Sequence, residues 1–400
     1  MEEAIKAGAK QRRSAAQKKS VGRGMRLVTG DMDGTLFAIV IALLAIGLTM
    51  MFSASYPAAI EDGKEGTFYA MRQLKFAGGG LVGMVLISLF GNYHWFEKPW
   101  VSIGAFLASL GLLVLVLFRG EDNGTFATRW LTIPGVGVTF QPSEVMKIAV
   151  ILCFSMMIAN NANRMHRFVY GVVPYIAALG VIAILMMKQP HLSGTIIILA
   201  LGIVLMVVGG CRIWHLAVLG GIGLAIGLIA LVAFDKFDYI GERFLAMQDP
   251  FNPEYMQKET WQTSQSLIAI GSGGFFGLGL GASRQKYQYL PEAQNDFVFA
   301  ILCEECGFVG AATVILLFCL LVVRGFYIAS KAPDRLGRLI AVGITVHIGM
   351  QAFLNIAVVS NLLPNTGISL PFFSYGGTAL MMQLAEMGLL LNISRQSSLE

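Results

Sequence analysis

Long apolar runs recur along this chain, and they constrain its fold more than any other feature of the sequence. Segments of about 18 or more apolar residues can cross the roughly 30 Å hydrocarbon core of a bilayer as helices. Because backbone groups in lipid must be hydrogen-bonded internally, and these runs are far too long for barrel strands, each run predicts an α-helix. Only 13% of the residues are charged, against roughly 25% in soluble domains. The sequence therefore predicts an all-α, polytopic membrane bundle and excludes a soluble globule.

We predict about ten transmembrane helices in this bundle. Most of them are joined by short loops, and the chain shows no soluble module and no convincing half-to-half repeat. The approximate bounds of the predicted spans are 36–55, 74–91, 99–118, 143–160, 168–187, 193–210, 213–234, 297–325, 337–360 and 374–392.

Lysine and arginine orient these spans, because short cytoplasmic loops carry an excess of the two residues. If the basic segment before the first span is cytoplasmic, most other loop cations fall on the same side, and so do both termini. We therefore divide the chain into a basic cytoplasmic tail, residues 1–35, and one membrane domain, residues 36–395. The tail fixes the topology, and contact with anionic lipid head groups is an alternative role. The loop cations on this side are Arg164, Arg167, Arg212, Arg324, Lys331, Arg335, Arg338 and Arg395.

A large outer loop, at about 235–296, separates the seventh and eighth spans. An unstructured loop of that length is uncommon unless it has a function. It contains the apolar, glycine-rich stretch WQTSQSLIAIGSGGFFGLGLGASRQKYQYLP, which is typical of a partly re-entrant segment that folds back over the bundle. The glycines do not predict a nucleotide site, because the GK[ST] ending of a phosphate-binding loop is missing.

Acidic residues follow this loop where the sequence becomes membrane-embedded again. Asp296 stands just before the eighth span, where capping of the helix N-terminus would by itself explain a carboxylate. Glu304 and Glu305 are roughly 12–14 Å further along the helix axis, too far for capping. We expect these two to bond other elements or to line a polar cleft, and Glu305 to hold the helices together.

The motif QPSEVMK at 141–147 begins the fourth span. Pro142 suits the first turn of a helix, and Glu144 suits its positive N-terminus. Lys147 lies one turn further on the same face and enters the apolar region. A simple helix cap and a polar site facing a cavity both remain open from the spacing alone.

The sequence gives little support for a metal site or for a hydrolase. Cys303 and Cys306 form a CxxC without a second ligand pair, so we expect no metal site there. The five histidines form neither an HExxH motif nor a serine–histidine–aspartate constellation, which argues against a hydrolase.

Five motifs follow one another along the chain: RW at 129–130, QPSEVMK at 141–147, QSLIAIGSGGFFGLGLGASRQK at 265–286, LPEAQNDFVFAILCEECGFVG at 290–310 and LPNTGISLPFFSYGGT at 363–378. Taken together, these motifs resemble the SEDS family (shape, elongation, division and sporulation), the FtsW, RodA and SpoVE proteins, and most closely the FtsW and SpoVE type. The resemblance covers about residues 36–395. It implies a bacterial plasma-membrane protein with ten spans and with both termini in the cytoplasm.

The activity that the resemblance implies is peptidoglycan glycosyl transfer. Lipid II is polymerised with inversion into β-1,4-linked glycan strands, and undecaprenyl pyrophosphate is released. The family's partners are a class B penicillin-binding protein, which is the transpeptidase, and other membrane proteins of the division or elongation machinery; nucleic acid is not expected. The basic extension favours the division or sporulation type.

The resemblance also assigns site residues. The essential acid of the family corresponds to Asp296, our candidate catalytic base, and its glutamate and lysine on the fourth helix correspond to Glu144 and Lys147. A divalent cation (Mg²⁺ or Mn²⁺) is compatible with this chemistry, although no ligand cluster in the sequence calls for one. Position 191 is histidine where many members have aspartate, so we carry no function to it. Other candidate substrate contacts are Arg72, Arg129, Arg243 and Lys286 for phosphate, and Gln265 and Ser266 for sugar hydroxyls.

Two other functions remain alternatives. A lipid II flippase needs a similar amphipathic cleft, but it would place its charges along a path across the membrane, whereas Asp296 is expected at the outer face. A non-catalytic scaffold for the transpeptidase would explain the apolar surface but not Asp296, Glu144 and Lys147.

Overall fold

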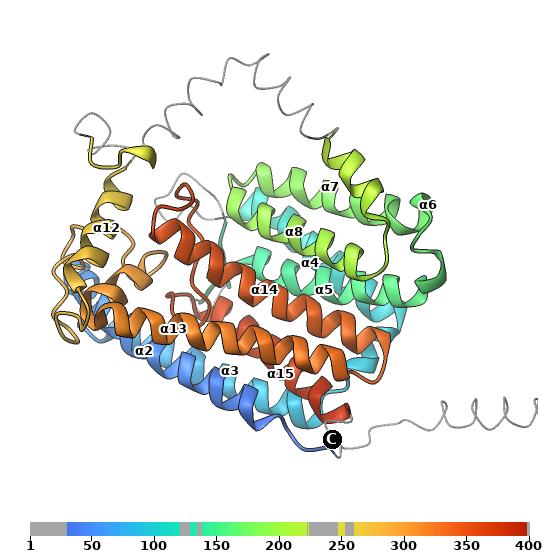
Figure 1. Ribbon diagram of the computed structural model, residues 1–400, viewed down its shortest axis with the longest axis horizontal. Helices are drawn as coiled ribbons and strands as arrows, with labels where there is room; N and C mark the ends of the chain where they lie inside the picture. Colours follow the sequence, from blue (N-terminus) through green and yellow to red (C-terminus); the bar gives the residue numbers. More distant parts are fainter. Residues whose placement is uncertain are drawn as a thin grey trace, which may run out of the picture.

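The computed structural model describes residues 30–120, 129–133, 138–221, 223, 247–252 and 260–397, which form a bundle of long α-helices (Figure 1). The tail before residue 30, Arg243 and most of the predicted span 213–234 lie outside these residues. The long helices are α2 (Gly34–Glu61), α3 (Phe68–Phe90), α4 (Pro99–Arg119), α5 (Pro142–Asn160), α7 (Val173–Met187), α8 (Leu192–Val208), α12 (Trp261–Gly273), α13 (Val298–Lys331), α14 (Arg335–Val359) and α15 (Gly377–Gln396). Shorter helices are η1 (Tyr93–Glu97), η2 (Ala162–Arg164) and α6 (Phe168–Gly171).

The helices confirm the predicted fold class. Each predicted span has described helical residues in the corresponding place, although for 213–234 only residues 213–221 and 223 are described. Seven helical segments of the described chain are long and apolar enough to cross a membrane, and Leu192–Val208 is a shorter apolar helix. α15 is more polar, and its Gln383, Glu386 and Asn392 are buried inside the bundle. The chain is therefore a multi-pass membrane protein.

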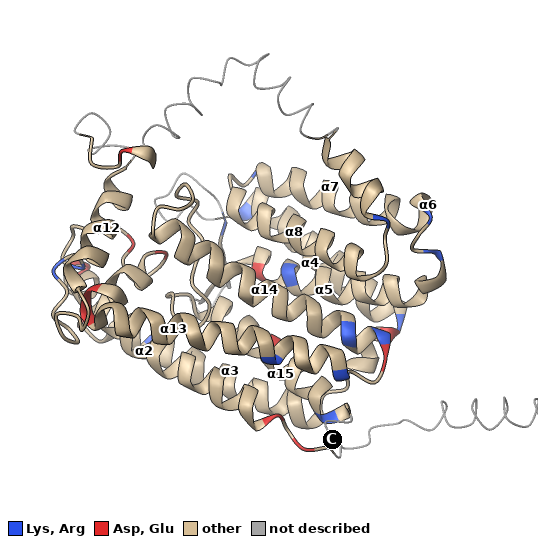
Figure 2. Ribbon diagram, in the orientation of Figure 1, with Lys and Arg blue, Asp and Glu red and all other residues tan. Residues whose placement is uncertain are grey.

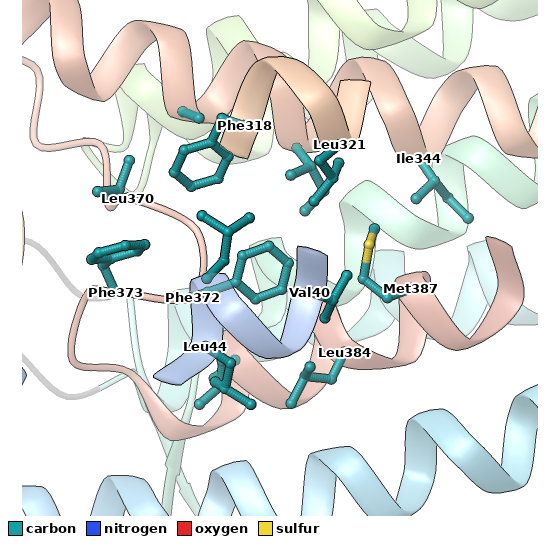
Figure 3. Packing of buried hydrophobic residues seen from close by; sticks show 14 of the residues in the cluster. Val40, Leu44, Phe318, Leu321, Ile344, Leu370, Phe372, Phe373, Leu384 and Met387 are labelled. Carbon is teal, nitrogen blue, oxygen red and sulfur yellow. The ribbon is translucent and has the colours of Figure 1, made fainter. Parts of the chain in front are cut away.

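α5 and α14 are the most buried of the seven apolar helices and lie at the centre of the bundle. On one side α2, α13 and α15 pack around Phe372 and Phe373, as Figure 3 shows. A β-carbon at Gly47 would lie 2.3 Å from the Phe372 carbonyl oxygen, so only glycine lets α2 approach this loop so closely. On the other side α4, α7 and α8 form a second apolar cluster with α5.

The first and last described helices meet at one end of the bundle. The amide of Asp33, which caps α2, donates to the Ser394 hydroxyl near the end of α15 (3.4 Å). The Asp33 carboxylate also pairs with Arg324 of α13 (Nε to Oδ2, 2.9 Å). Figure 2 shows that charged residues are sparse along the helices and gather towards their ends. The shared end agrees with the prediction that the two termini lie on the same side of the membrane.

α13 is sharply kinked at Gly307, which the apolar pattern did not predict. The residue has φ 64° and ψ −163°, a conformation in which a side chain is strained. The segment after α12 restores the backbone hydrogen bonds that the kink removes, so this part of the chain packs against α13. The amides of Leu278 and Gly279 donate to the carbonyls of Glu304 and Glu305 (3.0 Å each), and those of Phe308 and Val309 donate to the carbonyls of Gly274 and Phe275 (2.9 and 3.2 Å).

A small antiparallel hairpin precedes α5. It pairs β1 (Leu131–Ile133) with β2 (Val138–Phe140), with Thr132 opposite Thr139. Pro142 occupies the first turn of α5, as predicted. The hairpin brings Arg129, just before β1, to the end of the bundle where α5 begins.

Candidate active site

Asp296 lies just before α13, in a place fixed by two other segments. Its side chain is half-buried. The Asn355 side-chain amide of α14 donates to the Asp296 carbonyl oxygen (2.7 Å) and to that of Ile368 (2.6 Å). A β-carbon at Gly367 would lie 3.2 Å from the Asp296 carboxylate oxygen Oδ2. The carboxylate therefore faces the loop before α15, while its backbone is held by α14.

The environment of Asp296 makes it a stronger base than an exposed aspartate. Burial, with a contribution from the nearby Glu292 carboxylate, raises the pKa of Asp296 to about 6, although the Arg129 guanidinium acts in the opposite direction. A carboxylate with this pKa is mostly ionised at pH 7 and is better able to accept a proton. Such a group suits general base catalysis at neutral pH.

Arg129 joins the hairpin segment to the start of α8, and its charge acts on Asp296. Its Nη2 donates to the Pro190 carbonyl oxygen (2.5 Å). The next residue, His191, is buried, and its Nε2 lies 3.5 Å from the side-chain amide of Gln141. Burial and the Arg129 charge lower the pKa of His191 to about 3, so the imidazole is neutral at pH 7. Arg129 is thus the cation that acts on both Asp296 and His191.

Glu144 and Lys147 form the predicted pair inside the bundle. Lys147 Nζ lies 2.7 Å from Glu144 Oε2 and 2.9 Å from the Gln351 side-chain oxygen on α14. Glu144 is 7% exposed and Lys147 only 2%. Burial and the contact across to α14 favour the polar site over a simple surface cap, because a cap alone does not require a buried lysine.

Arg72 lies on α3 beside the segment that leads to Asp296. It hydrogen-bonds the hydroxyl of Tyr375. The Tyr375 backbone amide donates to the Gln294 carbonyl oxygen (2.9 Å). The neighbouring Gln73 accepts from the Gly376 amide (3.3 Å) and donates to the Ser374 carbonyl oxygen (3.2 Å). Arg72 is therefore linked through Tyr375 to Gln294, which precedes Asp296 by two residues in the chain.

The Lys286 ammonium, predicted to contact phosphate, is already hydrogen-bonded inside the protein. Its three ammonium donors bond the Glu305 carboxylate (2.9 Å), the Ser53 hydroxyl (2.9 Å) and the Gly281 carbonyl oxygen (2.8 Å). A phosphate could bind Lys286 only if one of these bonds broke. We therefore count Lys286 as an anchor of the outer loop.

Glu304 and Glu305 are the other half of this anchor. Glu305 also accepts from the backbone amides of Gly281 (3.0 Å) and Ser283 (3.3 Å). Glu304 accepts from the Ser283 hydroxyl (2.5 Å) and from the amide of Arg284 (3.0 Å). The two glutamates tie the outer loop to α13, as expected for residues that hold elements together.

The two predicted sugar contacts on α12 also lie inside the protein. Ser266 donates its hydroxyl to the Val359 carbonyl oxygen at the end of α14 (2.7 Å), so that donor is occupied. Gln265 is 5% exposed on the same helix. The structure brings neither side chain to the Asp296 carboxylate by a described contact.

Comparison with known proteins identifies the family. A family model that covers FtsW, RodA and SpoVE, described as "Cell cycle protein", matches residues 34–399. The chain belongs to this family. Stage V sporulation protein E of Bacillus subtilis (strain 168) is 41% identical, over 91% of this chain and 97% of that protein. The probable peptidoglycan glycosyltransferase FtsW of Geobacter sp. (strain M18) is 37% identical, over 92% of this chain and 98% of that protein.

Solved structures of the FtsW/RodA/SpoVE family share the fold. A chain from a peptidoglycan synthase complex, described for its coordination of polymerization and crosslinking, superimposes with a TM-score of 0.74 at 27% identity, over 92% of this chain and 99% of that chain. The rod shape determining protein RodA of Thermus thermophilus superimposes with a TM-score of 0.65 at 27% identity, over 92% of this chain and 98% of that chain. Both similarities extend over the bundle that carries Asp296, Glu144 and Lys147.

For this FtsW/RodA/SpoVE-family chain, sequence reasoning missed several polar residues around the site. Asn355 holds the Asp296 backbone, and Gln351 accepts a hydrogen bond from Lys147. His347 and Glu386 lie deeper in the bundle. A signal was present, because positions 347, 351 and 355 repeat every four residues and so share one face of a helix. Polar residues on one stripe of an apolar span indicate an interior partner.

Proposed function

We propose that this chain is a peptidoglycan glycosyltransferase that polymerises lipid II at the outer face of the bacterial plasma membrane. The observation that carries the proposal is the half-buried Asp296, whose pKa is raised to about 6 and on which the Arg129 charge acts. A base and a cation that acts on it suit a displacement in which a hydroxyl loses a proton while a diphosphate departs. Relatives named peptidoglycan glycosyltransferase support the same reaction class.

The proposed reaction is a single displacement. The 4-hydroxyl oxygen of one lipid II attacks the anomeric carbon of another and forms the β-1,4 bond. The bond from that carbon to the phosphate oxygen breaks, and undecaprenyl pyrophosphate leaves with both bonding electrons. Asp296 takes the hydroxyl proton. A positioned base contributes about 10²–10⁴-fold to such a rate.

Cations near Asp296 would stabilise the charge that develops on the diphosphate. Arg129 is the first candidate because it already acts on Asp296, and Arg72 is the second because it lies beside residues 294–296. Lys147 is the third, deeper in the bundle. Arginine can bind phosphate through two parallel hydrogen bonds, whereas lysine acts as a point charge.

The polyprenyl tail of the substrate would need an apolar surface that continues into this polar region. An open apolar groove of about 340 Å³ lies between α2 and α3 and includes Phe52, Met71 and Leu74. Met71 precedes Arg72 in the same turn of α3. A lipid in the groove would therefore place its head group beside Arg72.

The distribution of charge supports the proposed outer location. Asp296 lies at the end of the bundle where α13 begins. The cations Lys331, Arg335 and Arg338 lie at the opposite end, where α13 stops and α14 starts. The positive-inside rule makes that opposite end cytoplasmic. The polymer would thus form outside the cell, where peptidoglycan lies.

A class B penicillin-binding protein is the proposed partner, which would crosslink the strands that this chain makes. Other membrane proteins of the division machinery would join them. A divalent cation near Asp296 is proposed only together with substrate. Among the described residues no group of three His, Cys, Asp or Glu side chains could hold a metal, so phosphate oxygens would have to complete its coordination, and no step is derived from it.

The test is polymerisation of labelled lipid II by purified protein in detergent, with and without a candidate class B partner. Wild type is compared with Asp296→Asn and with a control, Glu61→Gln, which removes an exposed carboxylate at the same end of the bundle. Glycan polymer from wild type and control but not from a folded Asp296→Asn variant would support the proposal. Polymer from all three would remove Asp296 as the base. If none makes polymer even with the partner, the flippase or scaffold alternatives gain, and lipid II translocation in vesicles would decide between them.

A further inference from the structure

Three buried polar side chains form a column on α14. His347, Gln351 and Asn355 lie on successive turns, and each is 1% exposed. Asn355 holds the Asp296 backbone, as described above. The two below it connect Lys147 to a residue that the proposed reaction does not use, Glu386 of α15.

Gln351 is the junction of this network, and its orientation is fixed. Its amide nitrogen donates to the Ser369 carbonyl oxygen (3.1 Å) and hydroxyl (3.2 Å). Its side-chain oxygen then faces Lys147 Nζ at 2.9 Å and His347 Nε2 at 3.0 Å. Because a carbonyl oxygen only accepts hydrogen bonds, His347 must carry a proton on Nε2.

Glu386 fixes the other side of the imidazole. Both its carboxylate oxygens lie within hydrogen-bond distance of His347 Nδ1, at 3.0 and 2.9 Å. One proton must lie between these groups, whether it belongs to the nitrogen or to the carboxyl. The pair therefore keeps the Nε2 proton pointing at Gln351. In many active sites a carboxylate orients a histidine, and the histidine in turn orients a third group.

We propose that His347 and Glu386 are positioning residues for glycosyl transfer. They hold the Gln351 carbonyl towards Lys147 and so fix the direction of the ammonium. The inference rests on the proposed function, in which Lys147 acts on the substrate diphosphate. A lysine is a point charge on a flexible stem, so its direction depends on its acceptors. Glu144 and Gln351 are those acceptors among the described residues, and one ammonium donor is left for substrate.

A purely structural role is the competing explanation, because the pair also joins α14 to α15. Two variants of one residue separate the explanations. An amide nitrogen in His347→Gln lies near the position of Nε2 and can still donate to Gln351. The shorter His347→Asn places its amide near Nδ1, where it bonds Glu386 but does not reach Gln351. Both variants fill the space and remove the imidazole.

The experiment measures kcat and KM for lipid II polymerisation, together with the thermal unfolding midpoint of each variant in detergent. A control, Thr345→Val, removes a buried hydroxyl of the same helix that bonds only the Ala341 carbonyl oxygen (2.7 Å) in the described structure. We expect His347→Asn to lower kcat about 10-fold or more, as for other groups that orient a site residue, with an unfolding midpoint near that of His347→Gln. His347→Gln should stay within about threefold of wild type, since its donor to Gln351 remains.

Equal kcat values for the two variants, or losses that only follow their unfolding midpoints, would overturn the positioning role. If His347→Asn does not fold, Glu386→Gln decides. Its amide can donate to Nδ1 and leave the proton on Nε2, so retained kcat supports positioning, and lost kcat in a folded protein rejects it. Failure of the proposed function is distinguishable, because wild type itself would then make no polymer.

Discussion

The Lys286 ammonium lies 2.9 Å from the Glu305 carboxylate, and neither side chain exposes more than 3% of its surface. Lys286→Met should therefore destabilise the protein, because it leaves the Glu305 charge buried without its partner. Breaking such a buried pair costs about 3–5 kcal/mol. Thermal or denaturant unfolding in detergent measures the loss. The double variant Lys286→Met with Glu305→Gln should regain part of the stability. A phosphate-binding Lys286 would give the opposite result, with activity lost and stability unchanged.

Polymerisation should depend on the ionisation of Asp296. Because its pKa is raised to about 6 and the base must be ionised, kcat/KM should rise with pH to a plateau above about pH 7. Below pH 5 the rate should fall roughly tenfold for each pH unit. Initial rates measured between pH 4.5 and 8 on folded protein test this. A rate that stays level down to pH 4.5 would show that Asp296 is not the base.

Arg129→Gln should move this pH profile. The Arg129 charge lowers the pKa of Asp296, so its removal should raise that pKa and shift the acid limb to higher pH. The plateau rate should fall as well if Arg129 binds the departing diphosphate. Arg164→Gln, at the opposite end of the bundle, is the matched control and should leave the profile in place. An unmoved acid limb in Arg129→Gln would mean that the two side chains do not interact in solution.

Asp296→Asn should stabilise the protein at neutral pH although it abolishes activity. The folded-state pKa, about 6, is above the ordinary 3.8, so ionisation of the carboxylate destabilises the folded protein relative to the unfolded chain. The contribution of Asp296 to stability is present below about pH 4 and is lost as pH rises through 6. At pH 8 the asparagine variant should gain about 1–3 kcal/mol, since one pKa unit corresponds to 1.36 kcal/mol. Unfolding midpoints of both proteins at pH 4 and pH 8 give the comparison, and an equal difference at both values would contradict the prediction.

Gly307→Ala should disrupt the kink of α13. The backbone there has φ 64°, and a β-carbon would lie 2.3 Å from the Gly277 amide nitrogen, an overlap that only backbone movement can relieve. Strain in such a conformation alone costs about 1–3 kcal/mol. Gly271→Ala on α12 meets nothing within 4 Å and is the matched control, with an expected change of at most about 1 kcal/mol in the stabilising direction. Equal unfolding midpoints for the two variants would show that the kink tolerates a side chain.

Sequence patterns that depend on a single helix predicted the corresponding local structure. The length and polarity of the apolar runs within the described residues predicted their helices, and Pro142 with Glu144 marked the start of α5 because capping acts within one turn. The Glu144–Lys147 contact followed from a spacing of three residues on a helix.

Contacts between segments that are far apart in the chain could not be predicted from the sequence. From the sequence alone, a lysine in a loop is expected to be a free cation. Only the packing of the loop on α13 shows that Lys286 is paired with Glu305. His347 and Glu386 are 39 positions apart, so their contact depends on how α14 and α15 pack. The kink at Gly307 was equally hidden, because glycine is common in membrane helices and only the hydrogen bonds from residues 274–279 make it necessary.

Those hydrogen bonds also bear on how the protein is made. The residues on the two sides of the kink and the loop segment that bridges them are all within residues 274–309, so the kink closes through contacts between near neighbours in the chain. Near neighbours meet early, since the entropy lost on closing a short loop is small. This unit can therefore form as the chain enters the membrane, before α14 and α15 have been synthesised. The bend of α13 would then already be in place when α14 arrives, and Asn355 of α14 would fix Asp296 only afterwards.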